Sequence, residues 1–236
     1  RVVRITGRTE SHTEEALRPL YPKWARAEVP VSATILASLG QIELHLSARA
    51  GSSDRAATAA QAATWEVVEA LGLYAYSLDG RPLEQVVGDL LVERQFRIAL
   101  AESCTGGLLT SRLTDVAGSS RYVESAVVAY ANSAKVSLLG VPQVLIDQHG
   151  AVSEPVAVAM AEGVRASARV DLGVGVTGIA GPSGGAANKP VGTVAIAVAL
   201  SGSTRSQQFR FVGDRERVKR QASQAALDMV RRELLL

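Results

Sequence analysis

The stretch Arg97-Ile-Ala-Leu-Ala-Glu-Ser-Cys-Thr-Gly-Gly107 places a short apolar segment directly before a glycine turn. Residues 97–101 predict a buried strand, and the two glycines predict a turn into a helix that begins after residue 107. The same alternation of apolar strands and helical segments continues towards the end of the chain. Strands separated by helices favour a sheet with parallel pairs and helices on both faces.

This part of the chain therefore has the α/β fold class. We expect the last two strands to be antiparallel neighbours, so the sheet is predicted to be mixed. The expected helices are 83–93, one after 107, 132–139, 153–168 and 214–234, and the expected strands are 97–101, one ending at 130, 172–176, 191–200 and 207–211.

Residues 1–78 predict a separate small α+β domain, which the turn Asp79-Gly-Arg-Pro82 divides from a second domain at 79–236. The strand 41–47 alternates polar and apolar residues, so its apolar side chains share one face. Strands are also expected at 2–5 and 74–78. We predict a capping box at Ser11 and Glu14, and a helix at 54–71 that Ser53 or Asp54 caps and Gly72 ends.

The composition excludes several classes of protein. The chain has 236 residues, of which 47% are hydrophobic and 20% charged, which is typical of a folded globular protein. A net charge of +2 is too small for the electrostatic field of most nucleic-acid binders. The single cysteine, Cys104, excludes an internal disulfide and a multi-cysteine metal site, and it favours the cytoplasm. No apolar run is long enough to span a membrane.

Three polar or glycine-rich segments follow predicted strands, where open α/β sheets usually bind ligands. In the first, the turn after residue 101 can lift Ser103 or Cys104 towards the N–H groups of the helix start, which would stabilise an oxyanion. Alternatively, Ser103 or Thr105 caps the helix, while Gly106 and Gly107 permit close packing.

The second segment is Tyr130-Ala-Asn-Ser-Ala-Lys135. If Ala131 or Asn132 caps the next helix, Lys135 lies in its first turn, where the helix dipole repels an ammonium by roughly 0.3–1 kcal/mol. This repulsion lowers a lysine pKa by less than about one unit, so a base near neutrality also needs burial. The alternative is a solvated surface lysine.

The third segment is the loop from Thr177 to Gly185. Its glycines, Gly178 and Gly181 among them, allow several N–H groups to converge as in phosphate sites, and Lys189 adds a cation. It matches no common nucleotide fingerprint, so an ordinary loop is the competing interpretation. His149 lacks a second histidine nearby, so we expect no metal.

Five motifs occur in order between residues 80 and 236. They are Glu102-Ser-Cys-Thr-Gly-Gly107, Tyr130-Ala-Asn-Ser-Ala-Lys135, His149-Gly-Ala-Val-Ser-Glu154, Thr177-Gly-Ile-Ala-Gly-Pro182 and Lys189-Pro-Val-Gly-Thr193. Together they resemble the C-terminal domain of the CinA family, a nicotinamide mononucleotide (NMN) deamidase. The resemblance implies three α/β/α layers with a mixed sheet. It also implies hydrolysis of the NMN carboxamide to nicotinic acid mononucleotide and ammonia, without a cofactor or metal.

The resemblance implies a role for each matching residue. The family's serine and lysine correspond to Ser103 and Lys135, and we add Thr105 as a third catalytic residue. The departures at Ala131 and 183–187 leave Ser103 and Lys135 unchanged. The expected substrate-binding residues are Gly106, Gly107, Tyr130, Asn132, Thr177, Gly178, Gly181, Lys189 and Arg215.

The resemblance also bears on partners. Residues 1–78 resemble, less specifically, the KH-like middle domain of full-length members, which carry a further N-terminal domain similar to molybdopterin-binding proteins. The chain begins with Arg1, so we expect it to be excised from such a longer protein. The expected partners are a small nucleotide substrate and a second copy of the chain, with no nucleic acid and no membrane.

Three rival hypotheses remain at this point. Cys104 can be the nucleophile with Glu102 and Lys135, as in nitrilase-like amidases. The chain can instead be a module that senses nucleotides without turnover, or an RNA-binding module built on residues 1–78, although that segment lacks a Gly-x-x-Gly loop.

Overall fold

The structure is a computed structural model that describes residues 1–38 and 40–236. The chain divides into two compact units, residues 1–86 and 87–236. Each unit is described by itself.

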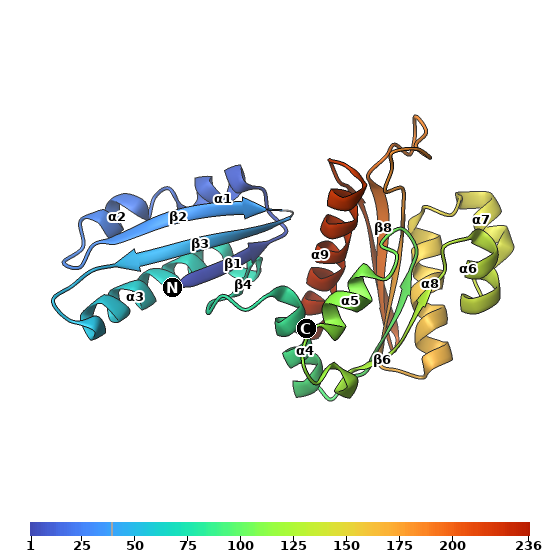
Figure 1. Ribbon diagram of the computed structural model, residues 1–236, viewed down its shortest axis with the longest axis horizontal. Helices are drawn as coiled ribbons and strands as arrows, with labels where there is room; N and C mark the ends of the chain where they lie inside the picture. Colours follow the sequence, from blue (N-terminus) through green and yellow to red (C-terminus); the bar gives the residue numbers. More distant parts are fainter. Residues whose placement is uncertain (39) are drawn as a thin grey trace. The chain divides into compact units, whose positions relative to one another are not determined.

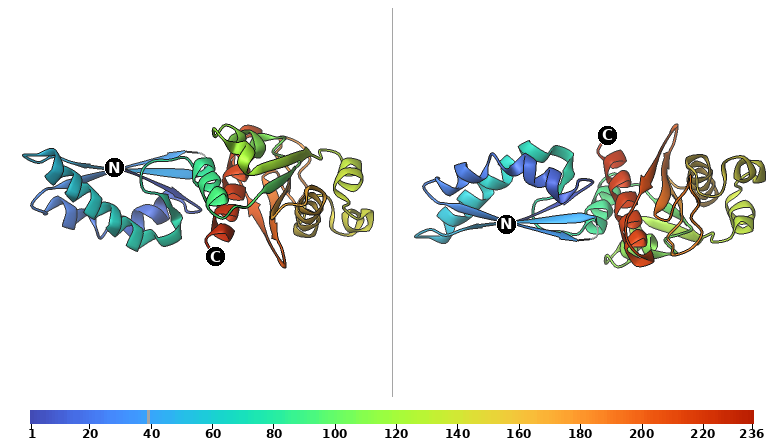
Figure 2. Two further views of the ribbon diagram at one scale, coloured as in Figure 1. Left: turned by 90° about the horizontal axis from the view of Figure 1, so that it is seen from below. Right: turned by 90° about the horizontal axis from the view of Figure 1, so that it is seen from above.

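The first unit is built on a four-stranded antiparallel sheet in the order β2-β3-β1-β4. Helices α1, α2 and α3 all lie on one face of this sheet (Figure 2). The elements are β1 (Val2–Thr6), α1 (Glu10–Leu17), α2 (Tyr21–Ala25), β2 (Val31–Ser38), β3 (Gln41–Ala48), α3 (Ser53–Leu71), a 3-10 turn (Gly72–Tyr74) and β4 (Ala75–Ser77).

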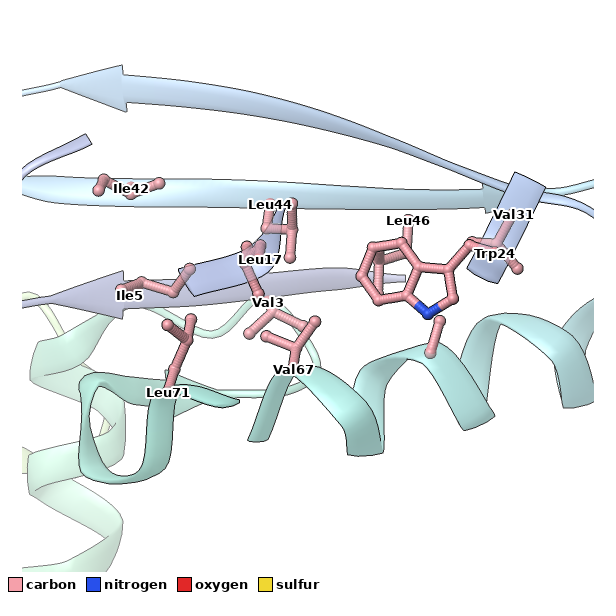
Figure 3. Close-up of a cluster of buried hydrophobic side chains, with 11 residues drawn as sticks. Val3, Ile5, Leu17, Trp24, Val31, Ile42, Leu44, Leu46, Val67 and Leu71 are labelled. Atoms are coloured by element: carbon pink, nitrogen blue, oxygen red, sulfur yellow. The ribbon is translucent and has the colours of Figure 1, made fainter. Parts of the chain in front are cut away.

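The core of this unit lies between the sheet and its helices. Ile42, Leu44 and Leu46 point to the same face of β3, as their alternation predicts, and all three are buried. Trp24 from α2 and Val67 from α3 pack against the strand residues from the opposite side (Figure 3). The polar residues that alternate with them along β3 lie on the other face of the sheet.

Several details of the first unit differ from the sequence prediction, and the helix α2 is one element that was not predicted. Thr9, not Ser11, caps α1, because its side chain accepts the N–H of His12. Ser52, one residue earlier than predicted, caps α3 by accepting the N–H of Arg55. The strand β2 was not predicted at all, although its eight residues pair with β3 over their whole length.

The second unit contains a five-stranded mixed sheet in the order β6-β5-β7-β8-β9. The predicted α/β class, the mixed sheet and the antiparallel last pair are confirmed. The elements are α4 (Leu83–Glu93), which begins before the division of the units, β5 (Ile98–Glu102), α5 (Leu108–Thr114), a 3-10 turn (Ser119–Arg121), β6 (Val123–Val128), α6 (Asn132–Leu139), α7 (Gln143–His149), α8 (Glu154–Ala168), β7 (Leu172–Gly178), β8 (Thr193–Leu200), β9 (Ser203–Arg210) and α9 (Arg215–Leu234).

Helices cover both faces of this sheet (Figure 1). On one face α8 packs against β5, β7 and β8, with α6 and α7 outside it, while α5 and α9 lie on the other face. Close packing of α8 depends on Gly173 and Gly175, where a Cβ would lie 2.2 Å from backbone oxygens of the helix. Apolar strand residues on both faces are therefore buried, as in other sheets between helices.

The helix α7 was not predicted as a separate element, and β9 begins four residues earlier than the predicted 207. Both segments are rich in polar residues, so hydrophobic periodicity marks them poorly. Across residues 1–38 and 40–236, no helix combines the length and the apolar character that a membrane crossing requires.

Candidate active site

The candidate site lies at the carboxyl ends of three neighbouring parallel strands. The central strand β5 pairs in parallel with β6 and β7, and Glu102 lies opposite Val128 on one side and Val176 on the other. The segments that follow these strands therefore start at the same edge of the sheet. They are the three segments that the sequence singled out.

Ser103 and Lys135 meet at this edge. The Lys135 Nζ atom lies 3.0 Å from the Ser103 Oγ atom, within hydrogen-bond distance. Ser103 is 7% exposed and Lys135 only 2%. Lys135 comes from the first half of α6, whose N-cap residue is Ala131. The loop after β6 thus directs a buried amine at the hydroxyl that follows β5.

Two backbone carbonyls complete the surroundings of the Lys135 amine. Nζ lies 3.0 Å from the Ala129 oxygen and 3.3 Å from the Tyr130 oxygen. A neutral amine has two N–H donors and one lone pair, which match these two carbonyls and the Ser103 hydroxyl. Burial lowers the pKa of Lys135 below its ordinary value, since the charged form loses its hydration. The arrangement favours an uncharged amine that accepts the serine proton.

Glu102 is fully buried and holds the start of α5. Its carboxylate accepts the N–H groups of Gly107, Leu109 and Thr110 at 2.8–3.1 Å and the Thr110 hydroxyl at 2.6 Å. Of the N–H groups from Thr105 to Gly107 that we expected to be free, the Gly107 N–H is therefore occupied by this carboxylate. The sequence pattern did not reveal this capping role.

The Cys104 side chain is buried against β7. Its side chain is 4% exposed. A Cβ on Gly178 would lie 2.9 Å from its sulfur atom, so the thiol packs closely against β7. Burial raises the pKa of Cys104 to about 12, so the thiol stays uncharged at neutral pH. A thiolate is the nucleophilic form of cysteine, and this environment disfavours it.

Thr105 is fully buried in the same turn, and its hydroxyl has no hydrogen-bond partner among the described residues. Gly106 and Gly107 follow with φ values of +62° and +91°, a conformation that favours glycine. The Gly106 N–H already donates to the Ser103 carbonyl at 3.1 Å. The Thr105 hydroxyl is thus a buried donor in this turn that the described residues leave without a partner.

The structure brings Tyr130, Gly181 and Arg215 together. One guanidinium nitrogen of Arg215 donates to the Gly181 carbonyl at 2.9 Å, and another donates to the Tyr130 hydroxyl at 2.6 Å. Arg215 is the first residue of α9 and Gly181 lies in the loop after β7. This arginine thus connects the second and third polar segments.

Each of the remaining predicted binding residues has surroundings of its own. Asn132 is exposed at the first position of α6. The Thr177 hydroxyl donates to the Ala151 carbonyl at 2.8 Å, and Gly178 leaves no space for a Cβ beside Val194. The ammonium of Lys189 donates to the His149 carbonyl at 2.5 Å, so the structure places this cation beside the end of α7.

Sequence reasoning missed one residue at this edge, Lys219. Its Nζ atom would lie 3.6 Å from a Cβ on Gly106, so it reaches the turn that carries Ser103. Lys219 lies four residues after Arg215 on α9, and side chains at that spacing share one helix face. This four-residue spacing from Arg215 was the feature of the sequence that could have identified Lys219.

Metal ligands do not gather here. In the described part of the chain, no group of three or more His, Cys, Asp or Glu side chains is arranged to hold a metal ion.

The fold and the site are those of a known family of proteins. Residues 80–234 match the family model of the CinA C-terminal domain. The chain belongs to the CinA family, and the resemblance of the five motifs is confirmed.

Particular relatives can be named. The chain is 46% identical over its full length to a CinA-like protein of Koribacter versatilis, of which it covers 56%. It thus spans about half the length of the curated relatives it matches. It is also similar to two crystal structures, the competence/damage inducible protein CihA from Agrobacterium tumefaciens (36% identity, TM-score 0.63) and competence damage-inducible protein A from Klebsiella pneumoniae (35% identity, TM-score 0.63). Each comparison covers 65% of this chain, and 94% and 95% of those chains respectively.

Proposed function

We propose that this protein is an amidohydrolase that converts NMN to nicotinic acid mononucleotide and ammonia, with Ser103 as nucleophile and Lys135 as base. The observation that carries the proposal is the 3.0 Å contact between Lys135 Nζ and Ser103 Oγ in a buried setting. The choice of NMN rests on the five motifs shared with the CinA C-terminal domain. The reaction would serve the salvage of pyridine nucleotides, in the cytoplasm.

In the first half of the reaction, neutral Lys135 takes the proton of Ser103 as the serine oxygen attacks the carboxamide carbon. The tetrahedral oxyanion then collapses and the C–N bond breaks. Lys135, now an ammonium, returns its proton to the leaving nitrogen, which departs as ammonia. The enzyme is left with an ester between Ser103 and the nicotinic acid carboxyl.

In the second half, water replaces the amine. Lys135 takes a proton from the water, whose oxygen attacks the ester carbon. The Ser103 oxygen then leaves and recovers a proton from Lys135. Both the serine hydroxyl and the neutral lysine are restored, so the cycle needs no other reactant.

Two further groups support the chemistry. The unpartnered Thr105 hydroxyl, two residues after the nucleophile, is the side chain we assign to the oxyanion. A buried hydroxyl without a partner carries an unfavourable free energy, which a developing negative charge would relieve. Tyr130 and Asn132 flank the start of α6 beside Lys135, and we assign them to the nicotinamide ring.

A direct test is ammonia release from NMN by the purified protein, in the presence of a chelator that removes contaminating metal. The proposal predicts one ammonia for each nicotinic acid mononucleotide formed. Tight NMN binding without any ammonia would contradict the proposal and favour a nucleotide-sensing module.

The pH dependence should follow the Lys135 amine. Only the neutral amine accepts the serine proton, so kcat/KM should fall as pH decreases through the lowered pKa of Lys135. We expect the pH profile to show one ionisation, in which the deprotonated form is active. Its midpoint should lie below the ordinary lysine pKa of 10.5. Stopped assays of ammonia across the pH range give the profile. A rate that stays constant from pH 5 to pH 10 would contradict the role of the amine.

The Cys104 thiol should not react with alkylating reagents in the folded protein. Since Cys104 is buried and its pKa is raised to about 12, iodoacetamide should leave it unmodified at neutral pH and alkylate it after denaturation. Mass spectrometry of the intact protein measures both reactions. Fast alkylation of the folded protein, with activity lost in proportion, would favour the Cys104 mechanism instead.

The two parts of the chain have separate assignments in this proposal. We assign the activity to residues 79–236, in three α/β/α layers, and treat residues 1–78 as a KH-like domain outside the chemistry. A second copy of the chain is the protein partner we propose.

A further inference from the structure

The turn that carries Ser103 is closed by the side chain of Glu102. The turn begins at Glu102, the last residue of β5, and ends at Gly107, the N-cap residue of α5. Gly106 and Gly107 have positive φ values and no side chains, so they restrict the backbone of the turn very little. The Gly107 N–H donates to the Glu102 Oε2 atom at 3.0 Å. This bond joins the two ends of the turn directly.

The Glu102 carboxylate has no acceptor position left for another group. Its Oε2 atom accepts the N–H groups of Gly107 and Leu109, and its Oε1 atom accepts the N–H and the hydroxyl of Thr110, at 2.6–3.1 Å. An ionised carboxylate offers about four lone-pair sites, and these four donors fill them. Since a protonated carboxyl could not accept all four, the group is an anion. It is therefore not free to take a proton from a serine or a water.

The bonds to Glu102 are costly to break. The residue is fully buried, so its charge depends on hydrogen bonds in place of water. The N–H groups at the start of α5 carry a partial positive charge, which favours an anion at this position. Any movement of the turn away from α5 would leave the buried charge without these donors. The carboxylate thus holds the turn in one conformation.

Two groups of the proposed reaction lie within this turn. The Ser103 Oγ atom lies 3.0 Å from Lys135 Nζ, and the Thr105 hydroxyl is the donor assigned to the oxyanion. Lys135 belongs to a different segment, α6, so its distance from Ser103 depends on where the turn holds the serine. A displacement of about 1 Å between reacting groups can lower a rate about 100-fold. The conformation of the turn therefore matters for the chemistry.

We propose that Glu102 is a positioning residue, whose carboxylate holds Ser103 and Thr105 in place for attack on the amide and takes no part in proton transfer. The inference rests on the proposed function. It also gives Glu102 a different role from the one it would have beside Cys104 in a nitrilase-like mechanism. Thr110 is its partner, because this threonine supplies two of the four donors.

Three variants of nearly unchanged size test the proposal. Glu102→Gln replaces one oxygen by an NH2 group, which is a donor and therefore cannot accept two of the four bonds. Thr110→Val removes only the hydroxyl that donates to Oε1. Thr114→Val is the matched control, since it also removes a threonine hydroxyl from α5. That hydroxyl donates to the Thr110 and Ser111 carbonyls and not to Glu102.

The first readout is steady-state hydrolysis of NMN, measured well below the melting temperature of every variant. Glu102→Gln should lower kcat about 10- to 100-fold, because the serine is displaced. Thr110→Val should lower kcat about 3- to 10-fold, since one bond to a charged group is lost. In both variants KM should change less than about 2-fold, which a loss confined to the transition state predicts. Thr114→Val should change neither constant more than about 2-fold.

The pH profile separates positioning from a direct role of the Glu102 charge. Burial lowers the pKa of Lys135, and both variants leave that burial unchanged. The midpoint of the kcat/KM profile should therefore stay at the wild-type value while kcat falls. A profile that loses or moves its midpoint in Glu102→Gln would overturn the positioning role and show that the carboxylate takes part in proton transfer.

The second readout does not depend on NMN. In phenylmethylsulfonyl fluoride the Ser103 oxygen would attack sulfur, so that an S–O bond forms, the S–F bond breaks and fluoride leaves, while the serine proton passes to Lys135. Peptide mass spectrometry measures the rate at which Ser103 is labelled. The rate should fall in Glu102→Gln and Thr110→Val in the same order as kcat, and it should stay unchanged in Thr114→Val.

The outcomes separate this inference from the proposed function. Labelling of Ser103 that is slower in both variants supports the role of Glu102, even if the protein releases no ammonia from NMN. A folded Glu102→Gln protein with kcat and labelling within about 2-fold of wild type overturns the positioning role and leaves the deamidase proposal intact. If only one of the two reactions occurs, that reaction decides, and a Ser103 that undergoes neither overturns both proposals. If Glu102→Gln does not fold, Thr110→Val decides by the same criteria.

Discussion

Replacing Ser103 by alanine should reduce kcat for NMN by at least about 1,000-fold, because the variant has no oxygen to attack the carboxamide carbon. Binding of NMN should change little, since the contacts of Arg215 with Gly181 and Tyr130 stay in place. The loss should therefore appear in kcat and not in the affinity. Ammonia release and calorimetric titration of NMN measure the two quantities.

A serine outside the site provides the control. Ser125 is exposed on β6, and Ser125→Ala removes the same atom without touching the candidate site. Its activity should equal that of the wild type. A Ser103→Ala protein that is folded and retains more than a tenth of wild-type kcat would show that another group attacks the amide.

Replacing Lys135 by methionine should lower kcat by about 100- to 10,000-fold, the range expected for the loss of a positioned base. Methionine has nearly the same length, so the buried space stays filled. The change leaves the Ala129 and Tyr130 carbonyls without their shared donor, and we expect a modest decrease in melting temperature. Activity is compared only after circular dichroism shows a native fold.

Lys135→Arg separates a base from a simple positive charge. A guanidinium stays protonated at every accessible pH, so arginine should not restore activity and should remove the lysine-dependent pH profile. Recovery of activity in Lys135→Arg would mean that position 135 supplies a charge and not a proton acceptor.

Much of the second unit could be predicted because its periodicity is strong. The apolar runs of β7 and β8 are buried on both faces, and α6 and α8 match the predicted ranges within one residue. The strand β2 was missed because its side chains, apart from Val31, are partly or fully exposed, and β3 supplies its pairing. A strand of that kind depends on its neighbour and not on its own pattern.

The candidate site was only partly predictable. Glycine turns after strands marked the positions of Ser103 and Gly181, and the polar segment after the next strand marked Lys135. The sequence did not predict where the Glu102 side chain points. A buried carboxylate next to a possible nucleophile is compatible both with a catalytic role and with helix capping. Only the distances to the N–H groups of α5 distinguish the two. The contribution of Lys219 depends on how α9 packs, which no local pattern gives.

The central claim is that the Ser103 oxygen becomes covalently bound to the substrate's carbonyl carbon. Wild-type protein is mixed with excess NMN, quenched in acid during turnover and digested with trypsin, which releases residues 98–112 as one peptide. We predict that mass spectrometry finds this peptide heavier by NMN less ammonia, with fragmentation placing the added mass on Ser103. The same added mass on Cys104, or on a peptide from another part of the chain, would contradict the account.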